Sequence, residues 1–293
     1  MHVLVTGATG FVGSRLVEPL LEAGHEVRVF VRDAADYRGP REVEVYEGDL
    51  LEPETIPPAL EGIDAVYYLV HSMSSGDEFE AMDRKLAANV RDAVSESNID
   101  RVIYLGGLGD ETDDLSGHLR SRREVEYVLE EGSYDLTALR AAVIIGEESA
   151  SFELIEQLTA RLPVMITPSW VRTDCQPIAI DDVIAYLMGV LEEPETAGET
   201  YEIGGPEVLT YQSMLHTTSE ILGKSLYILP VPVLTPVLSA YWVGLVTDVP
   251  RDVAYPLAAG LKNPVVVNDD RISRYVEIDP IPFETAVRQA LGE

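Results

Sequence analysis

Residues 2–13 read HVLVTGATGFVG, and this stretch decides the fold of the chain. An apolar run predicts a buried strand, and glycine then recurs at Gly7, Gly10 and Gly13 before a pattern that predicts a helix. Gly7 permits a tight turn, Gly10 lets a pyrophosphate approach the backbone, and Gly13 lets the helix pack close to the strand. The alternative is a purely structural glycine turn. Because amide groups at a helix start attract anions, we expect a dinucleotide to bind at Gly7, Thr9, Gly10, Phe11, Val12 and Gly13.

Short apolar runs alternate with helical patterns through the first half of the chain. Such alternation predicts an α/β protein, in which helices cover both faces of a parallel sheet. The expected strands are 2–6, 26–31, 43–47, 64–70, 101–106 and 135–140, and the expected helices are 11–23, 79–97 and 119–131. We predict a Rossmann-type, doubly wound sheet in residues 1–150, completed by about residues 176–205. Residues 151–175 and 206–293 are expected to form a smaller, mainly helical lobe over the carboxyl edge of the sheet.

The composition is strongly acidic, because 51 Asp and Glu residues face 21 Lys and Arg residues among 293, for a net charge of −30. Like charges repel, so nucleic acids and anionic membranes are disfavoured as partners. Lysine occurs only at positions 85, 224 and 262, a bias that resembles proteins from cells with a high-salt interior; an ordinary acidic cytoplasmic protein is the alternative. The single cysteine, Cys175, fits a reducing compartment. We therefore expect a cytoplasmic protein whose partner is a small molecule.

The end of the second predicted strand, VFVRD at residues 29–33, bears on the choice of nucleotide. An arginine at this place can bind a ribose 2′-phosphate in a bidentate pair, whereas a carboxylate accepts a hydrogen bond from a 2′-hydroxyl. Arg32 therefore favours NADP(H), and Arg15 could reach the same phosphate. Asp33 keeps NAD(H) as the alternative. Both arginines could also be solvated surface residues.

The spacing Gly-x-x-Gly-x-x-Gly after the first strand resembles the cofactor motif of extended and atypical short-chain dehydrogenase/reductases. Other blocks are similar to an atypical NAD(P)H-binding subgroup that includes NmrA-like proteins, nucleoside-diphosphate-sugar-epimerase-like proteins and the 39-kDa subunit of respiratory complex I. These blocks are YLVHSM at 68–73, LGGLG at 105–109, HLRSR at 118–122 and CQPIAIDDV at 175–183. The resemblance implies that Asp49 and Leu50 contact adenine and that Asn89 is the family's structural asparagine.

The same resemblance implies a Tyr-x-x-x-Lys motif in the helix after the fifth strand, but His118 stands in place of the tyrosine and Arg122 in place of the lysine. We expect His118 to be the proton donor, because imidazole titrates near neutrality, and Arg122 to contact cofactor ribose or substrate. His71, at the end of the fourth strand, is expected near the nicotinamide. For each histidine the alternative is a hydrogen-bonded loop residue.

These expectations lead to two functions. The first is an NADP(H)-dependent oxidoreductase with a degenerate catalytic motif, acting on an unidentified small molecule such as an apolar carbonyl compound or a quinone. The alternative is a non-catalytic NADP(H)-binding protein, either a redox sensor or an accessory or assembly protein of respiratory complex I. The oligomeric state stays open.

Residues 225–247 carry no charge over 23 positions, a length that could span a bilayer. Pro230, Pro232 and Pro236 oppose one regular helix. We therefore expect a buried helix plus loop, with membrane contact as the less favoured alternative. The five histidines lack metal-ligand spacing, so no metal site is expected.

Overall fold

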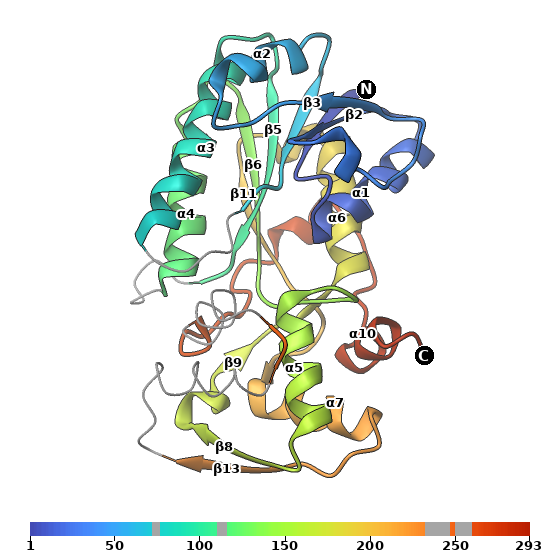
Figure 1. Ribbon diagram of the computed structural model, residues 1–293, viewed down its shortest axis with the longest axis vertical. Coiled ribbons are helices and arrows are strands. Elements are labelled where there is room, and N and C mark those ends of the chain that lie inside the picture. Colours follow the sequence, from blue (N-terminus) through green and yellow to red (C-terminus); the bar gives the residue numbers. More distant parts are fainter. Residues whose placement is uncertain (72–76, 110–115, 232–246, 250–259) are drawn as a thin grey trace.

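The computed structural model describes residues 1–71, 77–109, 116–231, 247–249 and 260–293. Seven strands form a fully parallel sheet in the order β3-β2-β1-β4-β5-β6-β11 (Figure 1). The strands are β1 (His2–Thr6), β2 (Glu26–Val31), β3 (Glu44–Glu47), β4 (Ala65–Tyr68), β5 (Arg101–Gly107), β6 (Asp135–Ala141) and β11 (Thr200–Ile203). This order confirms the predicted doubly wound sheet, and it places the reversal of strand order between β1 and β4.

Helices cover both faces of the sheet because alternate residues of its strands are apolar on both sides. Val3 and Val5 pack toward the core beneath α1 (Phe11–Glu22) and α6 (Ile180–Glu192). Leu4 packs into the opposite core, which is covered by α2 (Ile56–Ala59), α3 (Asp77–Ser95) and α4 (Gly117–Glu130). Figure 1 shows α3 and α4 on one side of the sheet and α1 and α6 on the other.

The turn between β1 and α1 depends on two glycines in particular. Gly7 has φ 73°, in the left-handed region that favours glycine, and a Cβ there would lie 2.6 Å from the carbonyl oxygen of Leu69. A Cβ on Gly13 would lie only 2.2 Å from the carbonyl oxygen of Gly7. The helix and the strand therefore approach each other as closely as expected from the sequence, and this packing leaves no room for a side chain at Gly7 or Gly13.

A second group of elements lies beyond the carboxyl ends of the strands (Figure 1). It contains α5 (Ala150–Arg161), β8 (Val164–Pro168), β9 (Asp174–Cys175), β12 (Leu209–Thr210), α7 (Tyr211–Ile221), β13 (Tyr227–Val231) and α10 (Phe283–Ala290). These elements share an apolar core that includes Phe152, Met214 and Val287. A short parallel pair, β7 (Ile144–Ile145) and β10 (Ile178–Ala179), lies where the chain passes between the two groups. Single turns of 3₁₀ helix are η1 (Ala34–Asp36), η2 (Pro53–Thr55), η3 (Ser169–Arg172), η4 (Pro194–Thr196) and η5 (Arg271–Arg274).

The charge-free segment at 225–247 differs from the predicted buried helix where the structure describes it. Residues 227–231 form the strand β13, which pairs in parallel with β8; residues 232–246 lie outside the described part. Tyr227 and Leu229 are 66% and 55% exposed, and their register partners Val164 and Ile166 are 46% and 57% exposed. Residues 227–231 thus form a strand and not a helix because they pair with β8. One face of the two-stranded sheet of β8 and β13 is apolar and exposed to solvent. Within the described residues, no helix has the length and apolar character that crossing a bilayer requires.

Candidate functional site

The start of α1 has a geometry that would suit an anion. Its N-cap residue, Gly10, offers no side-chain hydrogen bond to the first amides of the helix. Gly10, Phe11, Val12 and Gly13 all line a cavity. Uncapped amides at a helix start carry partial positive charge and fit a phosphate group. A pyrophosphate therefore suits this turn. The positive φ of Gly7 gives the turn its shape, and Thr9 is exposed at its tip.

The two arginines proposed to bind a 2′-phosphate have different surroundings. Arg15 donates to the carbonyl oxygens of Phe11 (2.9 Å) and Glu147 (2.8 Å), and it lies 3.3 Å from the carboxylate of Glu148. Its guanidinium is thus directed at the loop before α5. Arg32 is exposed just after β2, and no hydrogen bond or ion pair joins its guanidinium to another described residue. Arg32 therefore keeps its donors available, whereas Arg15 would have to exchange existing contacts.

The turn after β3 holds the residues proposed to contact adenine. Asp49 Oδ1 accepts a hydrogen bond from the backbone N–H of Leu51 at 2.9 Å, and the Leu50 side chain is buried. Asn89, on α3, donates from Nδ2 to the carbonyl oxygen of Leu50 at 2.7 Å. The asparagine thus fixes the backbone of this turn, which is a structural role.

His118 and Arg122 form one hydrogen-bonded unit on α4. Arg122 Nε donates to His118 Nε2 at 3.1 Å. Burial and the adjacent guanidinium lower the pKa of His118 from 6.5 to about 3. The structure therefore corrects one sequence-based argument: this imidazole is neutral near pH 7, and titration near neutrality is no reason to expect a proton donor here. Since arginine only donates, Nε2 accepts and the proton of the neutral ring is on Nδ1.

Two contacts fix α4 against the sheet around this pair. Tyr104, on β5, donates from its hydroxyl to the carbonyl oxygen of Arg122 at 2.8 Å. One turn further along, Glu126 is 1% exposed and accepts from Arg140, on β6, through Nε (3.1 and 3.0 Å) and Nη2 (2.5 Å). This pair was not among the residues expected from the sequence, where its signal is an acidic residue within the buried stripe of an amphipathic helix.

His71 lies at the carboxyl end of β4 and also lines the cavity. Its Nε2 is 3.1 Å from the carbonyl oxygen of Leu105, and its ring meets the Tyr104 ring edge-on at 5.7 Å between centroids. Burial, reinforced by the nearby Arg122 guanidinium, places the pKa of His71 well below its usual value. The structure thus brings His71, His118 and Arg122 to the same cavity as the glycine turn.

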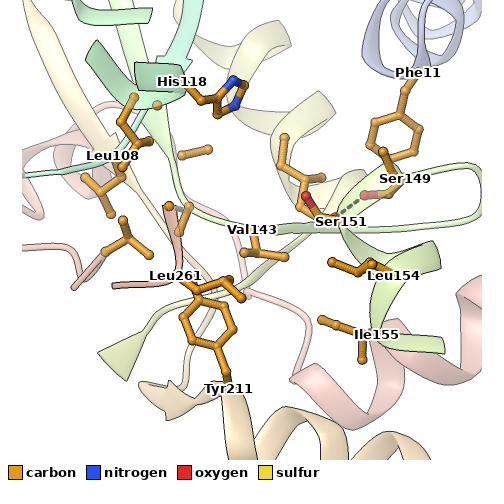
Figure 2. Close-up of a pocket in the computed structure, with 18 of the residues that line it drawn as sticks. Phe11, Leu108, His118, Val143, Ser149, Ser151, Leu154, Ile155, Tyr211 and Leu261 are labelled. Carbon is orange, nitrogen blue, oxygen red and sulfur yellow. Dashed lines mark hydrogen bonds between the residues drawn. The ribbon is translucent and has the colours of Figure 1, made fainter. Parts of the chain in front are cut away.

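The cavity has a volume of about 830 Å³ and two unlike ends. The glycine turn, His71, His118 and Arg122 line one end. The other end lies between α5, β8 and α7, and its described lining carries no charged side chain. Figure 2 shows His118 and Tyr211 on opposite sides of the cavity, with Val143 and Leu261 between them. The aliphatic lining of that end consists of Leu154, Ile155, Leu158, Val164, Met165, Ile166, Val171, Leu215, Leu261 and Val265.

Neither this apolar lining nor Glu148 was expected from the sequence. Glu148 lines the cavity beside the glycine turn and has φ 67°, a strained value for a residue with a side chain. A weak signal was present, since GEES at 146–149 reads as a turn followed by the N-cap of α5. The aliphatic residues gave no such signal, because an ordinary apolar core has the same composition.

Comparisons with known proteins agree with this geometry. Residues 7–167 match a family model described as NAD(P)H-binding. The photosystem II assembly factor Ycf39 of Trieres chinensis is 25% identical over 239 residues, covering 79% of this chain and 72% of that protein. The mitochondrial NADH dehydrogenase [ubiquinone] 1 alpha subcomplex subunit 9 of Arabidopsis thaliana is 28% identical over 235 residues, covering 74% of this chain. The chain spans only 56% of that subunit's length.

Solved structures share the fold at low sequence identity. The NADPH-dependent quinone oxidoreductase of Escherichia coli, complexed with NADPH, superposes with a TM-score of 0.80 at 19% identity and covers 99% of both chains. A nucleoside-diphosphate-sugar epimerase from Staphylococcus aureus gives a TM-score of 0.79 at 17% identity, over 98% of this chain and 100% of the epimerase. At these identities the likeness establishes the architecture alone.

Proposed function

Because the chain belongs to the NAD(P)H-binding family of atypical short-chain dehydrogenase/reductases, we propose that it is an NADP(H)-dependent oxidoreductase acting on an apolar carbonyl compound or quinone. The observation that carries this proposal is the single cavity that joins the glycine turn to an aliphatic end. Residues 1–150 and about 176–205 would hold the nucleotide. Residues 151–175 and 206–293 would supply the apolar end, against which an apolar substrate would pack.

The neutral imidazole of His118 can serve this chemistry as a hydrogen-bond donor. A bound reduced nicotinamide supplies the hydride. His118 Nδ1–H would donate to the acceptor oxygen, which gains negative charge as the carbonyl is reduced. The ring keeps its Nδ1 proton, because a neutral imidazole is a very weak acid, and the reduced oxygen takes its proton from water. Arg122 Nε, 3.1 Å from Nε2, holds the ring in this tautomer. In this proposal the His118–Arg122 pair replaces the Tyr-x-x-x-Lys machinery of the family.

Turnover with a panel of acceptors tests the function. The protein is incubated with NADPH and either quinones or long-chain aldehydes and ketones, and loss of the reduced-nicotinamide absorbance is followed. We expect oxidation with apolar acceptors and none with charged sugars. His118→Ala should abolish turnover and leave NADPH binding intact, while His216→Ala, on α7, should change neither. Unaltered turnover in His118→Ala would dismiss His118 as the donor.

The preference for NADP(H) rests on Arg32, whose guanidinium is exposed after β2. Arg32→Ala should weaken NADPH binding by about 10- to 100-fold, as expected for lost hydrogen bonds between charged groups, and should change NADH binding little. Arg38→Ala, a nearby exposed arginine, is the matched control. Equal losses for both nucleotides in Arg32→Ala would refute a 2′-phosphate contact and favour NAD(H).

A second function is favoured by one observation, the replacement of the tyrosine and lysine of the family by His118 and Arg122. A protein that binds NADP(H) without turnover, as a redox sensor or as an accessory or assembly protein of complex I, needs neither residue. Relatives with such names, the complex I subunits and the photosystem II assembly factor, support this alternative. Tight NADPH binding with no oxidation by any acceptor would favour it.

A further inference from the structure

His71 lines the cavity, and its buried Nδ1 has no hydrogen-bond partner among the residues that the structure describes. His71 Nε2 lies 3.1 Å from the carbonyl oxygen of Leu105, and a carbonyl oxygen only accepts, so Nε2 carries the proton. The ring is neutral, because burial lowers the pKa of His71 well below its ordinary value. Nδ1 therefore has a bare lone pair. This atom is buried, and no described residue donates to it.

A buried acceptor without a donor costs about 1–3 kcal/mol, so a polar ligand atom is the natural partner for Nδ1. The position of His71 in the fold indicates which ligand could supply this atom. His71 follows β4 at the carboxyl edge of the sheet, beside the reversal of strand order where nucleotides bind in such folds. The same cavity is lined by the glycine turn on one side of His71 and by Arg122 on the other.

Arg122, which lines the same cavity as His71, already uses one of its N–H groups within the protein. The resemblance to the family motif implies a lysine at position 122, where this chain has arginine. Arg122 instead donates from Nε to His118, and burial lowers its own pKa. A ribose hydroxyl is a donor that matches the lone pair of His71 Nδ1.

We propose that His71 Nδ1 accepts a hydrogen bond from a hydroxyl group of the nicotinamide ribose, which makes His71 a positioning residue for the cofactor. This inference rests on the proposed binding of NADP(H). The other donors that could reach Nδ1 are the carboxamide of the nicotinamide and a hydroxyl group of the substrate.

Calorimetric titration with three nucleotides separates these donors. NADPH contains both the ribose and the nicotinamide, 2′-phospho-ADP-ribose contains the ribose alone, and 2′,5′-ADP contains neither. His71→Leu should weaken NADPH and 2′-phospho-ADP-ribose by about threefold to tenfold and leave 2′,5′-ADP unchanged. A loss confined to NADPH would overturn the proposal in favour of the carboxamide. No loss with any nucleotide would overturn it in favour of the substrate.

Two further variants guard against damage to the fold. His71→Gln retains a donor for the carbonyl oxygen of Leu105 and supplies a new acceptor, so its affinities should lie closer to the wild type than those of His71→Leu. His25→Leu is the matched control, because His25 also has a buried, unpartnered Nε2 but does not line the cavity. Equal weakening of all three nucleotides in His71→Leu and His71→Gln would overturn the proposal. Failure of wild-type protein to bind NADPH would instead refute the proposed function.

Discussion

At the scale of single residues, burial and the nearby Arg122 guanidinium set the protonation state of His118 and of His71. The family motif predicted that His118 lies on the helix after the fifth strand; the structure has it there, on α4, where it lines the cavity. Its protonation state was not predictable, since burial against the Arg122 guanidinium is a property of the packed helix. The same holds for His71, whose proposed acceptor role is inferred from its contact with the carbonyl oxygen of Leu105 on the neighbouring strand β5.

The depressed pKa of His118 has a consequence for stability. In the unfolded chain the pKa is 6.5 and in the folded protein it is about 3, so below pH 6.5 only the unfolded state takes up this proton. The free energy of unfolding should therefore fall as the pH is lowered from about 6.5, by up to about 1.4 kcal/mol per pH unit from this group. In His118→Gln this fall should be smaller, as measured by urea unfolding at a series of pH values. His216→Gln is the control, and an equal pH dependence in wild type and His118→Gln would contradict the prediction.

At the scale of elements, the glycine turn is the feature that the sequence predicted best. Two of its requirements are local: Gly7 has φ 73°, and a Cβ on Gly13 would meet the carbonyl oxygen of Gly7. The contact of Gly7 with Leu69 adds a constraint from a distant part of the chain. The strands were predictable as well, since buried parallel strands are short and continuously apolar. Residues 227–231 show the limit, because YILPV forms a strand through its pairing with β8, more than fifty positions earlier. A local pattern contains no information about such a partner.

A prediction at this scale concerns the packing of α1 on β1. Gly13→Ala introduces a Cβ where only 2.2 Å separates it from the carbonyl oxygen of Gly7. The helix must shift, which should lower the free energy of unfolding by about 1–3 kcal/mol and abolish nucleotide binding. Ser14→Ala, at the next and exposed position, should affect neither. Thermal unfolding and calorimetry of both variants would check this, and nucleotide binding retained by Gly13→Ala would count against the anion site at this turn.

At the scale of the whole molecule, one cavity connects the two groups of elements, and no local signal in the sequence predicted its apolar lining. The Glu126–Arg140 pair belongs to this scale as well, because it fixes α4, which carries His118, to the strand β6. Thr200, on β11, also lies 3.4 Å from the Glu126 carboxylate. The pair therefore joins a helix to two neighbouring strands of the sheet.

Removing one member of this pair should be more harmful than removing both. Arg140→Met leaves the buried Glu126 carboxylate without its main partner, and such a loss costs about 3–5 kcal/mol. The double variant Arg140→Met with Glu126→Leu should recover most of that stability, because an apolar pair avoids the desolvation of charges. Urea unfolding of the single and double variants measures the difference. A double variant as unstable as Arg140→Met would show that the ion pair itself is required.

The net charge of −30 also acts on the whole molecule. Repulsion between carboxylates destabilises the compact state, and salt shortens its range from about 10 Å at 0.1 M to about 3 Å at 1 M. The midpoint of thermal unfolding should therefore rise by roughly 5 °C or more between these NaCl concentrations, for a gain of about 2 kcal/mol. Scanning calorimetry would detect the rise. A midpoint that stays constant or falls would mean that self-repulsion is not a major cost in this fold.

The position of β11 in the chain has a consequence for synthesis on the ribosome. This strand closes the outer edge of β6, yet it begins at residue 200, about sixty positions after β6 ends at residue 141. Until those residues emerge, the nascent protein presents a row of unpaired backbone groups along β6, which is a template for pairing between chains. Premature termination between residues 142 and 199 would thus release fragments with a complete glycine turn and an open, aggregation-prone border.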